Sequence, residues 1–168
     1  AIDPARDLTT AEINDFEVGV ISLEQNDGDY VLPPGIEREQ LQGSTTIQQQ
    51  NEQSVTLKVN NLPQNAARAI YKNISVDLRR SKNLKMFIHA EPVIQGAVAD
   101  DDLVAILRLG TDLDENFYQI EIPLKMSPNG SLSPLDVWPE ANNLDALLET
   151  FGPLKVERDE NSLPINQL

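Results

Sequence analysis

The stretch Phe117-Tyr118-Gln119-Ile120-Glu121-Ile122-Pro123-Leu124 decides the fold class of this chain. Tyr118, Ile120, Ile122 and Leu124 stand at every second position of it, opposed to Phe117, Gln119 and Glu121. Alternation with a period of two predicts a β-strand with one covered face. The sequence therefore predicts at least one strand with one buried face.

Four further segments have strand patterns. Three of them alternate, and the fourth is almost continuously apolar, as in a strand covered on both faces. A turn is expected at Pro128-Asn129-Gly130. The four segments are Asp15–Leu23, Ser54–Val59, Leu84–Glu91 and the apolar Asp102–Leu109.

The remaining segments have weaker patterns. Gln25–Glu39 is expected to be loop, and Gln40–Gln53 an edge strand or a loop. Leucines at helical spacing predict a helix over Asn143–Thr150, which Phe151-Gly152-Pro153 would stop. The other expectations are a helical turn over Asn65–Tyr71 and short strands over Val76–Leu78 and Leu154–Glu157.

Short strands separated by turns, with few helices, indicate a mainly β fold built as an antiparallel β-sandwich. A jelly roll of the galactose-binding type, with one or two short helices, is the expected variant because several connections are too long for hairpins. We expect a polar leader over residues 1–14, a single domain over 15–158 and a tail over 159–168.

Composition excludes several classes of function. The net charge is −14, which disfavours binding to nucleic acid and to anionic lipid. Cysteine is absent and His89 is the one histidine, so thiolate chemistry and multi-histidine metal sites are excluded. No apolar run approaches the roughly 20 residues of a membrane helix. No phosphate-binding glycine loop or nucleophile elbow occurs either.

Clustered carboxylates are the first candidate site. Asp112, Asp114 and Glu115 are weak calcium candidates, as are Asp100–Asp102, because calcium takes six to eight hard oxygen ligands. Their spacing matches no EF-hand loop. We therefore interpret these acids as solvated loop ends, and we expect no cofactor.

Three other features could serve a partner or a reaction. Arg79, Arg80 and Lys82 form the positive patch of an acidic chain and could pair with an acidic partner, or be a polar turn. Trp138 could stack on a ligand or anchor a core or an interface. His89 lacks an evident nucleophile in the sequence, so we interpret it as a hydrogen-bonded or surface residue.

Several stretches, taken in order, resemble the SprA/Sov family of gliding-motility proteins of the Bacteroidetes. The resemblance covers Phe16 to Glu157, and its specificity lies in the number and order of the stretches. They are Phe16–Val20, Asp29–Gly35, Asn51–Ser54, Arg68–Lys72, Asp77–Arg80, Leu84–Glu91, Leu107–Asp112, Tyr118–Leu124 and Val137–Glu140.

The resemblance implies a soluble domain or fragment of the outer-membrane translocon of the type IX secretion system, which serves protein export and gliding motility. The expected location is the outer membrane or cell surface, on either its periplasmic or its extracellular side. The implied partners are the rest of the translocon chain, other secretion-system proteins and exported cargo, without lipid insertion by this segment. The implied role is structural and non-catalytic.

Two other functions stay open at this point. A carbohydrate-binding jelly roll, with a structural calcium, would need exposed aromatic rings near Trp138 or Tyr118. A glycoside hydrolase would need two carboxyl groups about 5–9 Å apart, but 27 acidic residues offer such pairs by chance. The sequence contains no assembled catalytic set, so we expect no enzyme.

Overall fold

The computed structural model describes residues 7–26, 28–38, 49–112 and 116–161. Within them the strands form three separate two-stranded antiparallel sheets. These ribbons pair β1 (Phe16–Ser22) with β2 (Gln53–Val59), β3 (Asn83–Met86) with β6 (Leu144–Leu147), and β4 (Val104–Gly110) with β5 (Phe117–Pro123).

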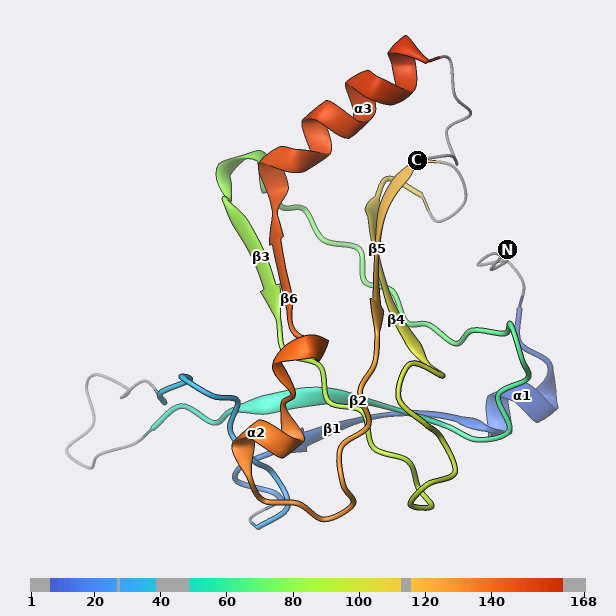
Figure 1. Ribbon diagram of the computed structural model, residues 1–168, viewed down its shortest axis with the longest axis vertical. Helices are drawn as coiled ribbons and strands as arrows, with labels where there is room; N and C mark the ends of the chain where they lie inside the picture. The colour runs from blue at the N-terminus through green and yellow to red at the C-terminus, as the bar shows by residue number, and fades with distance from the viewer. Residues whose placement is uncertain (1–6, 27, 39–48, 113–115, 162–168) are drawn as a thin grey trace.

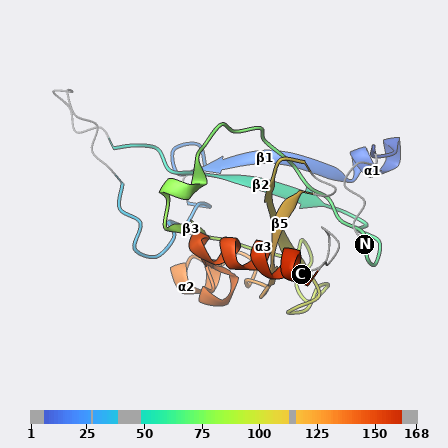
Figure 2. The ribbon, with the colours of Figure 1, turned by 90° about the horizontal axis from the view of Figure 1, so that it is seen from above.

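The β1–β2 ribbon lies across the base of Figure 1, and the β3–β6 and β4–β5 ribbons rise from it. Seen from above, β1–β2 runs along one side of the molecule, and α2 (Pro134–Val137) and α3 (Phe151–Glu160) lie on the other (Figure 2). The remaining short elements are α1 (Thr10–Asn14) and the 3-10 turns η1 (Leu78–Arg80), η2 (Glu140–Asn142) and η3 (Leu148–Thr150).

The prediction of a mainly β, antiparallel fold is confirmed. The strands expected over Asp15–Leu23, Ser54–Val59 and Phe117–Leu124 form with bounds shifted by one residue or less. The turn at Pro128 closes through a hydrogen bond from the Ser131 amide to the Pro128 carbonyl, 3.2 Å long. The sandwich or jelly-roll arrangement is not confirmed, because the described strands form separate ribbons.

Two long strand predictions were partly wrong. Leu84–Glu91 is a strand only as far as Met86, because its partner β6 begins at Leu144, directly opposite Met86. Asp102–Leu109 does form a strand, but it is not covered on both faces. The strand is Val104–Gly110; within the described part of the chain it pairs with β5 alone, and Val104 and Ile106 stay exposed.

The helix and the strand predicted within residues 143–157 were both wrong: the structure has a strand in place of the helix and a helix in place of the strand. Leu144–Leu147 is a strand, since pairing with β3 outweighs the helical spacing of its leucines. The strand expected over Leu154–Glu157 is part of helix α3. Pro153 does not stop that helix, because it lies in the first turn, where backbone amides have no partner within the helix.

Two short predictions between β2 and β3 were wrong as well. Asn65 occupies a left-handed turn position with φ of 62°, and no helix follows it up to Tyr71. Leu78 begins the turn η1 rather than ending a strand. Residues 25, 26 and 28–38 form neither helix nor strand, as predicted, whereas Asp27, residues 39–48 and residues 113–115 lie outside the described residues.

The core is small and consists of the connections between ribbons. Among the described residues, the buried hydrophobic side chains are Tyr30, Leu124, Val137, Trp138 and Leu144. Four of these five stand outside the strands. Helix α1, with its capping box between Thr9 and Glu12, lies within the polar leader expected over residues 1–14. Helix α3 runs through residue 158, where the domain was expected to end and the tail to begin. In the described part of the chain, no helix combines the length and the apolar character needed to cross a membrane.

Candidate functional site

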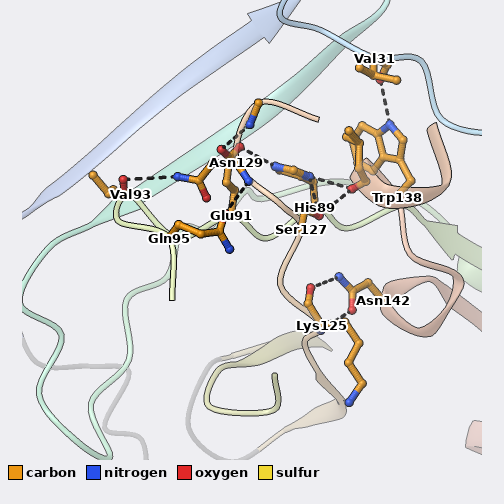
Figure 3. Close-up of polar contacts among 12 residues, drawn as sticks. Val31, His89, Glu91, Val93, Gln95, Lys125, Ser127, Asn129, Trp138 and Asn142 are labelled. Atoms are coloured by element: carbon orange, nitrogen blue, oxygen red, sulfur yellow. Dashed lines mark hydrogen bonds and ion pairs between the residues drawn. The ribbon is translucent and has the colours of Figure 1, made fainter. Parts of the chain in front are cut away.

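The connections meet in a polar and aromatic cluster, which we call the junction. It joins the loop at Val31, the segment that follows β3, the segment that follows β5, and the stretch from α2 to η2 (Figure 3). Its central side chains are His89, Ser127, Trp138 and Asn142. The junction therefore links the β3–β6 and β4–β5 ribbons to each other and to the loop between β1 and β2.

Trp138 ends helix α2 and is only 6% exposed. Its indole Nε1–H donates a hydrogen bond of 2.8 Å to the carbonyl of Val31 (Figure 3). Phe87 and His89 meet its ring edge-on, with ring centroids 6.2 and 5.9 Å away. A buried tryptophan with a paired N–H acts as a packing anchor.

His89 uses both of its ring nitrogens inside the protein. Its Nδ1 lies 2.7 Å from the carbonyl of Val137, and its Nε2 lies 3.3 Å from a carboxylate oxygen of Glu91. A carbonyl only accepts hydrogen bonds, so Nδ1 carries the hydrogen. The interpretation of His89 as a hydrogen-bonded residue agrees with this geometry.

Ser127 is completely buried beside His89. Its Oγ donates to the Val137 carbonyl at 3.3 Å and lies 3.3 Å from His89 Nδ1. The Ser127 amide donates to the carbonyl of Ala90 at 2.7 Å. Serine, histidine and glutamate therefore stand in a row, but the histidine nitrogen nearest the serine is a donor and cannot accept its proton.

Asn142 is also completely buried. Its side chain pairs with both main-chain polar groups of Lys125, as a neighbouring strand would (Figure 3). Nothing in the sequence singled out Asn142 or Ser127. Their partners are mostly main-chain atoms far along the chain, and these leave no residue pattern to detect.

The loop after β5 is held by a second group of contacts. The Asn129 amide donates to the side chain of Gln95 at 2.9 Å, and the Gly130 amide donates to Glu91 at 3.3 Å (Figure 3). Glu91 thus contacts both the turn and His89. The turn predicted at Pro128 is in this way part of the junction.

The acidic candidates are used in local contacts. Asp101 contacts the Lys125 ammonium at 2.7 Å, Asp100 accepts from the Met126 amide, and Asp102 accepts from the Ala99 amide. The hydrogen bond to Asp101 raises the pKa of Lys125, and the charges of Asp101 and Asp100 act in the same direction.

The calcium alternative at Asp112, Asp114 and Glu115 is not tested by the structure. Both carboxylate oxygens of Asp112 accept hydrogen bonds from Asn116, and Asp114 and Glu115 lie outside the described residues. Within the described ranges, no three acidic or histidine side chains gather closely enough to hold a metal ion.

The partner-binding candidates stand at two ends of one ribbon. Arg79 and Arg80 belong to η1, and Lys82 directly precedes β3, whose first residue pairs with the last residue of β6. Trp138 lies beyond the opposite end, where Met86 faces Leu144. The structure therefore does not bring the basic turn and the tryptophan together, and their role in binding stays a prediction.

A shallow hollow of about 270 Å³ opens beside the indole of Trp138. This is just below the usual range of small-molecule sites, about 300–1,000 Å³. One face of Tyr118 is covered by Phe151, with ring centroids 4.7 Å apart. Trp138 is buried, so it does not offer the exposed aromatic ring that a carbohydrate-binding module requires, and Tyr118 is half-buried with one face against Phe151. The hollow is lined by Tyr30, Pro33, Ile36, Glu52, Gln53, Ser54, Phe87 and Trp138.

Comparison with known families places the chain among proteins related to motility and secretion. The family model SprA_N, described as motility related/secretion protein, matches residues 3–168. The chain therefore belongs to the SprA_N family of motility related/secretion proteins. No curated protein matches it.

Proposed function

We propose that this chain is a non-catalytic interaction domain of the type IX secretion translocon at the outer membrane, where it serves protein export and gliding motility. The observation that carries this proposal is the match to the motility related/secretion family over residues 3–168. Its partners are the rest of the translocon chain, other secretion-system proteins and passing cargo.

The distribution of apolar side chains supports an interaction role. Only five hydrophobic side chains of the described residues are buried, whereas many large ones are exposed on the ribbons, the connections and helix α3. Examples are Tyr71 between β2 and β3, Val93 between β3 and β4, and Leu135 in helix α2. Exposed apolar surface on this scale is typical of a protein that packs against others.

The junction supports the absence of catalysis. A serine nucleophile needs an accepting nitrogen on its histidine and access to substrate. The His89 Nδ1–H points at the Val137 carbonyl, and Ser127 is fully buried. These groups are therefore suited to holding ribbon ends together rather than to attacking a substrate.

The test is an export assay in source cells that carry altered versions of the parent gene. We expect in-frame deletion of the segment to abolish export of surface proteins. Ser127→Ala should leave export near the parental level, since it removes a hydrogen bond worth only about 1 kcal/mol. Normal export from the deletion strain would contradict the proposal. Loss of export with a folded Ser127→Ala chain would instead indicate catalysis.

A further inference from the structure

The β1–β2 ribbon carries all of its apolar side chains except Ile21 on one face. Phe16 lies opposite Val59, Val18 opposite Leu57, and Val20 opposite Val55. Side chains two residues apart along a strand point the same way, so these three cross-strand pairs form one continuous surface. We call this surface, made of those six residues, the outer face.

The outer face is turned away from the protein's own core. Val18, Val20, Val55 and Leu57 are between 45% and 62% exposed, whereas Phe16 and Val59 at one end are half-buried. On the opposite face, Glu17 and Lys58 are exposed at that same end. At the other end Ile21 and Ser54 are half-buried, and the Ser54 hydroxyl lies 3.0 Å from that of Tyr30 in the core. A free-standing sheet has the reverse arrangement, with its apolar face inward. The ribbon is therefore built to be covered from outside.

We infer that the outer face docks on the apolar face of an antiparallel sheet of another polypeptide, one whose rim is neutral or basic. This inference rests on the proposed function and specifies the surface through which the interaction occurs. Sheets pack face to face about 10 Å apart through interdigitated side chains. A two-stranded ribbon with three apolar cross-strand pairs presents the kind of surface that such packing uses.

The open edges of the ribbon favour a protein partner over lipid. Among the described residues, neither β1 nor β2 pairs with a third strand. Each outer edge therefore presents backbone N–H and C=O groups without a strand partner. Hydrocarbon cannot satisfy such groups, whereas a neighbouring polypeptide or water can.

Charge disfavours a second copy of the same chain as the partner. One copy carries −14, so two copies carry −28. Acidic residues stand at both ends of the ribbon, with Asp15 before β1 and Glu52 before β2. Like charges brought within a Debye length of about 8–10 Å repel one another. A neutral or basic rim on a different polypeptide avoids this repulsion.

The absence of cysteine from the sequence makes a direct test possible. Leu57→Cys places one thiol on the outer face, and Ile94→Cys places one at a connection residue whose native side chain is 72% exposed. Each variant is expressed within its parent protein, and a small maleimide is applied to isolated cell envelopes. We expect the thiol at position 57 to react about tenfold more slowly than the thiol at position 94 if most chains are docked. In the purified, unassembled chain the two rates should be similar.

A benzophenone attached to the same thiol identifies what covers it. Cross-linking to an alternating apolar strand of another polypeptide supports the inference, provided that Val20→Lys with Val55→Lys abolishes the product. The control pair Val93→Lys with Ile94→Lys should leave it intact. Cross-linking to lipid, to a second copy or to another segment of the parent chain itself would overturn the inference, as would equal maleimide rates in envelopes. Should Leu57→Cys fail to accumulate, Val18→Cys reports on the same surface.

This result is separable from the export assay. Rapid labelling at position 57 in a strain whose export still depends on the segment would remove the docking surface and leave the proposed function standing. Normal export after deletion of the segment would remove the proposed function itself.

Discussion

Asn142 holds both main-chain polar groups of Lys125. Its Oδ1 accepts a hydrogen bond from the Lys125 amide at 2.7 Å, and its Nδ2 donates to the Lys125 carbonyl at 2.9 Å. Asn142 is fully buried, so water cannot replace it there. One side chain thus joins the segment after β5 to the turn η2 that precedes β6, and this link is central to the account of the junction.

Replacing Asn142 should therefore be costly. We expect Asn142→Ala to lower the free energy of unfolding by about 2–4 kcal/mol, because it leaves two part-buried main-chain groups without partners. Urea denaturation followed by circular dichroism measures this. Asn73→Ala, at an exposed position without a hydrogen bond in the described structure, should change it by less than about 0.5 kcal/mol. Equal effects of the two substitutions would contradict the role of Asn142.

Trp138 is the one tryptophan of the chain, so its fluorescence reports on the junction. We expect emission at short wavelength and weak quenching by iodide in the native state, since the ring is buried. Trp138→Phe should lower the free energy of unfolding by about 1–3 kcal/mol through loss of packing and of the bond to the Val31 carbonyl. Tyr71→Phe, at an exposed ring, is the matched control. Strong quenching of the native protein would instead indicate a ring available to ligands.

Asp145 gives a prediction for acid pH. The hydrogen bond from Asn83 and the contact with Lys85 lower its pKa below the ordinary 3.8. A lowered pKa stabilises the fold above the ordinary value, and this contribution is lost as pH falls through the lowered pKa. Asp145→Asn should thus flatten the stability profile in that acid range. Asn73→Ala, at an exposed residue that does not titrate, should keep the parental profile.

The titration of the Asp145 side chain can be followed directly by carboxyl-carbon NMR. A midpoint below the ordinary aspartate value is expected. A midpoint at or above that value would mean that the contacts with Asn83 and Lys85 do not form in solution.

Calcium should not change the stability of the chain. The carboxylates of Asp100, Asp101 and Asp102 are engaged by Met126, Lys125 and Ala99, and Asp112 is engaged by Asn116. We expect equal melting temperatures in calcium, in magnesium and in chelator. A rise specific to calcium that Asp112→Asn removes would contradict this expectation and favour the carbohydrate-binding alternative.

Sequence alternation predicted strands well wherever a single partner strand matches the whole segment. Phe117–Leu124 and Ser54–Val59 are such cases. It failed where pairing ends early, as after Met86, because the length of the partner is not encoded in the segment itself. Around residues 143–157, leucine spacing and a Gly-Pro pair suggested the wrong element, since contact with β3 and the position of Pro153 in the helix decide the outcome.

The site was less accessible to sequence reasoning than the strands. His89 and Trp138 are rare residue types in this sequence, but their hydrogen-bond partners are the main-chain carbonyls of Val137 and Val31. Only the fold brings these atoms together. The outward orientation of the β1–β2 apolar face was equally hidden, because alternation shows that two faces differ and not which of them is covered.

The measurement that tests the central claim most directly is a blot of fractionated source cells with an antibody raised against this chain. The account predicts a signal in the outer-membrane fraction, on a polypeptide much larger than 18.6 kDa, that is retained with the secretion machinery. A free species of about 18.6 kDa, confined to the fraction that contains no membrane, would contradict it.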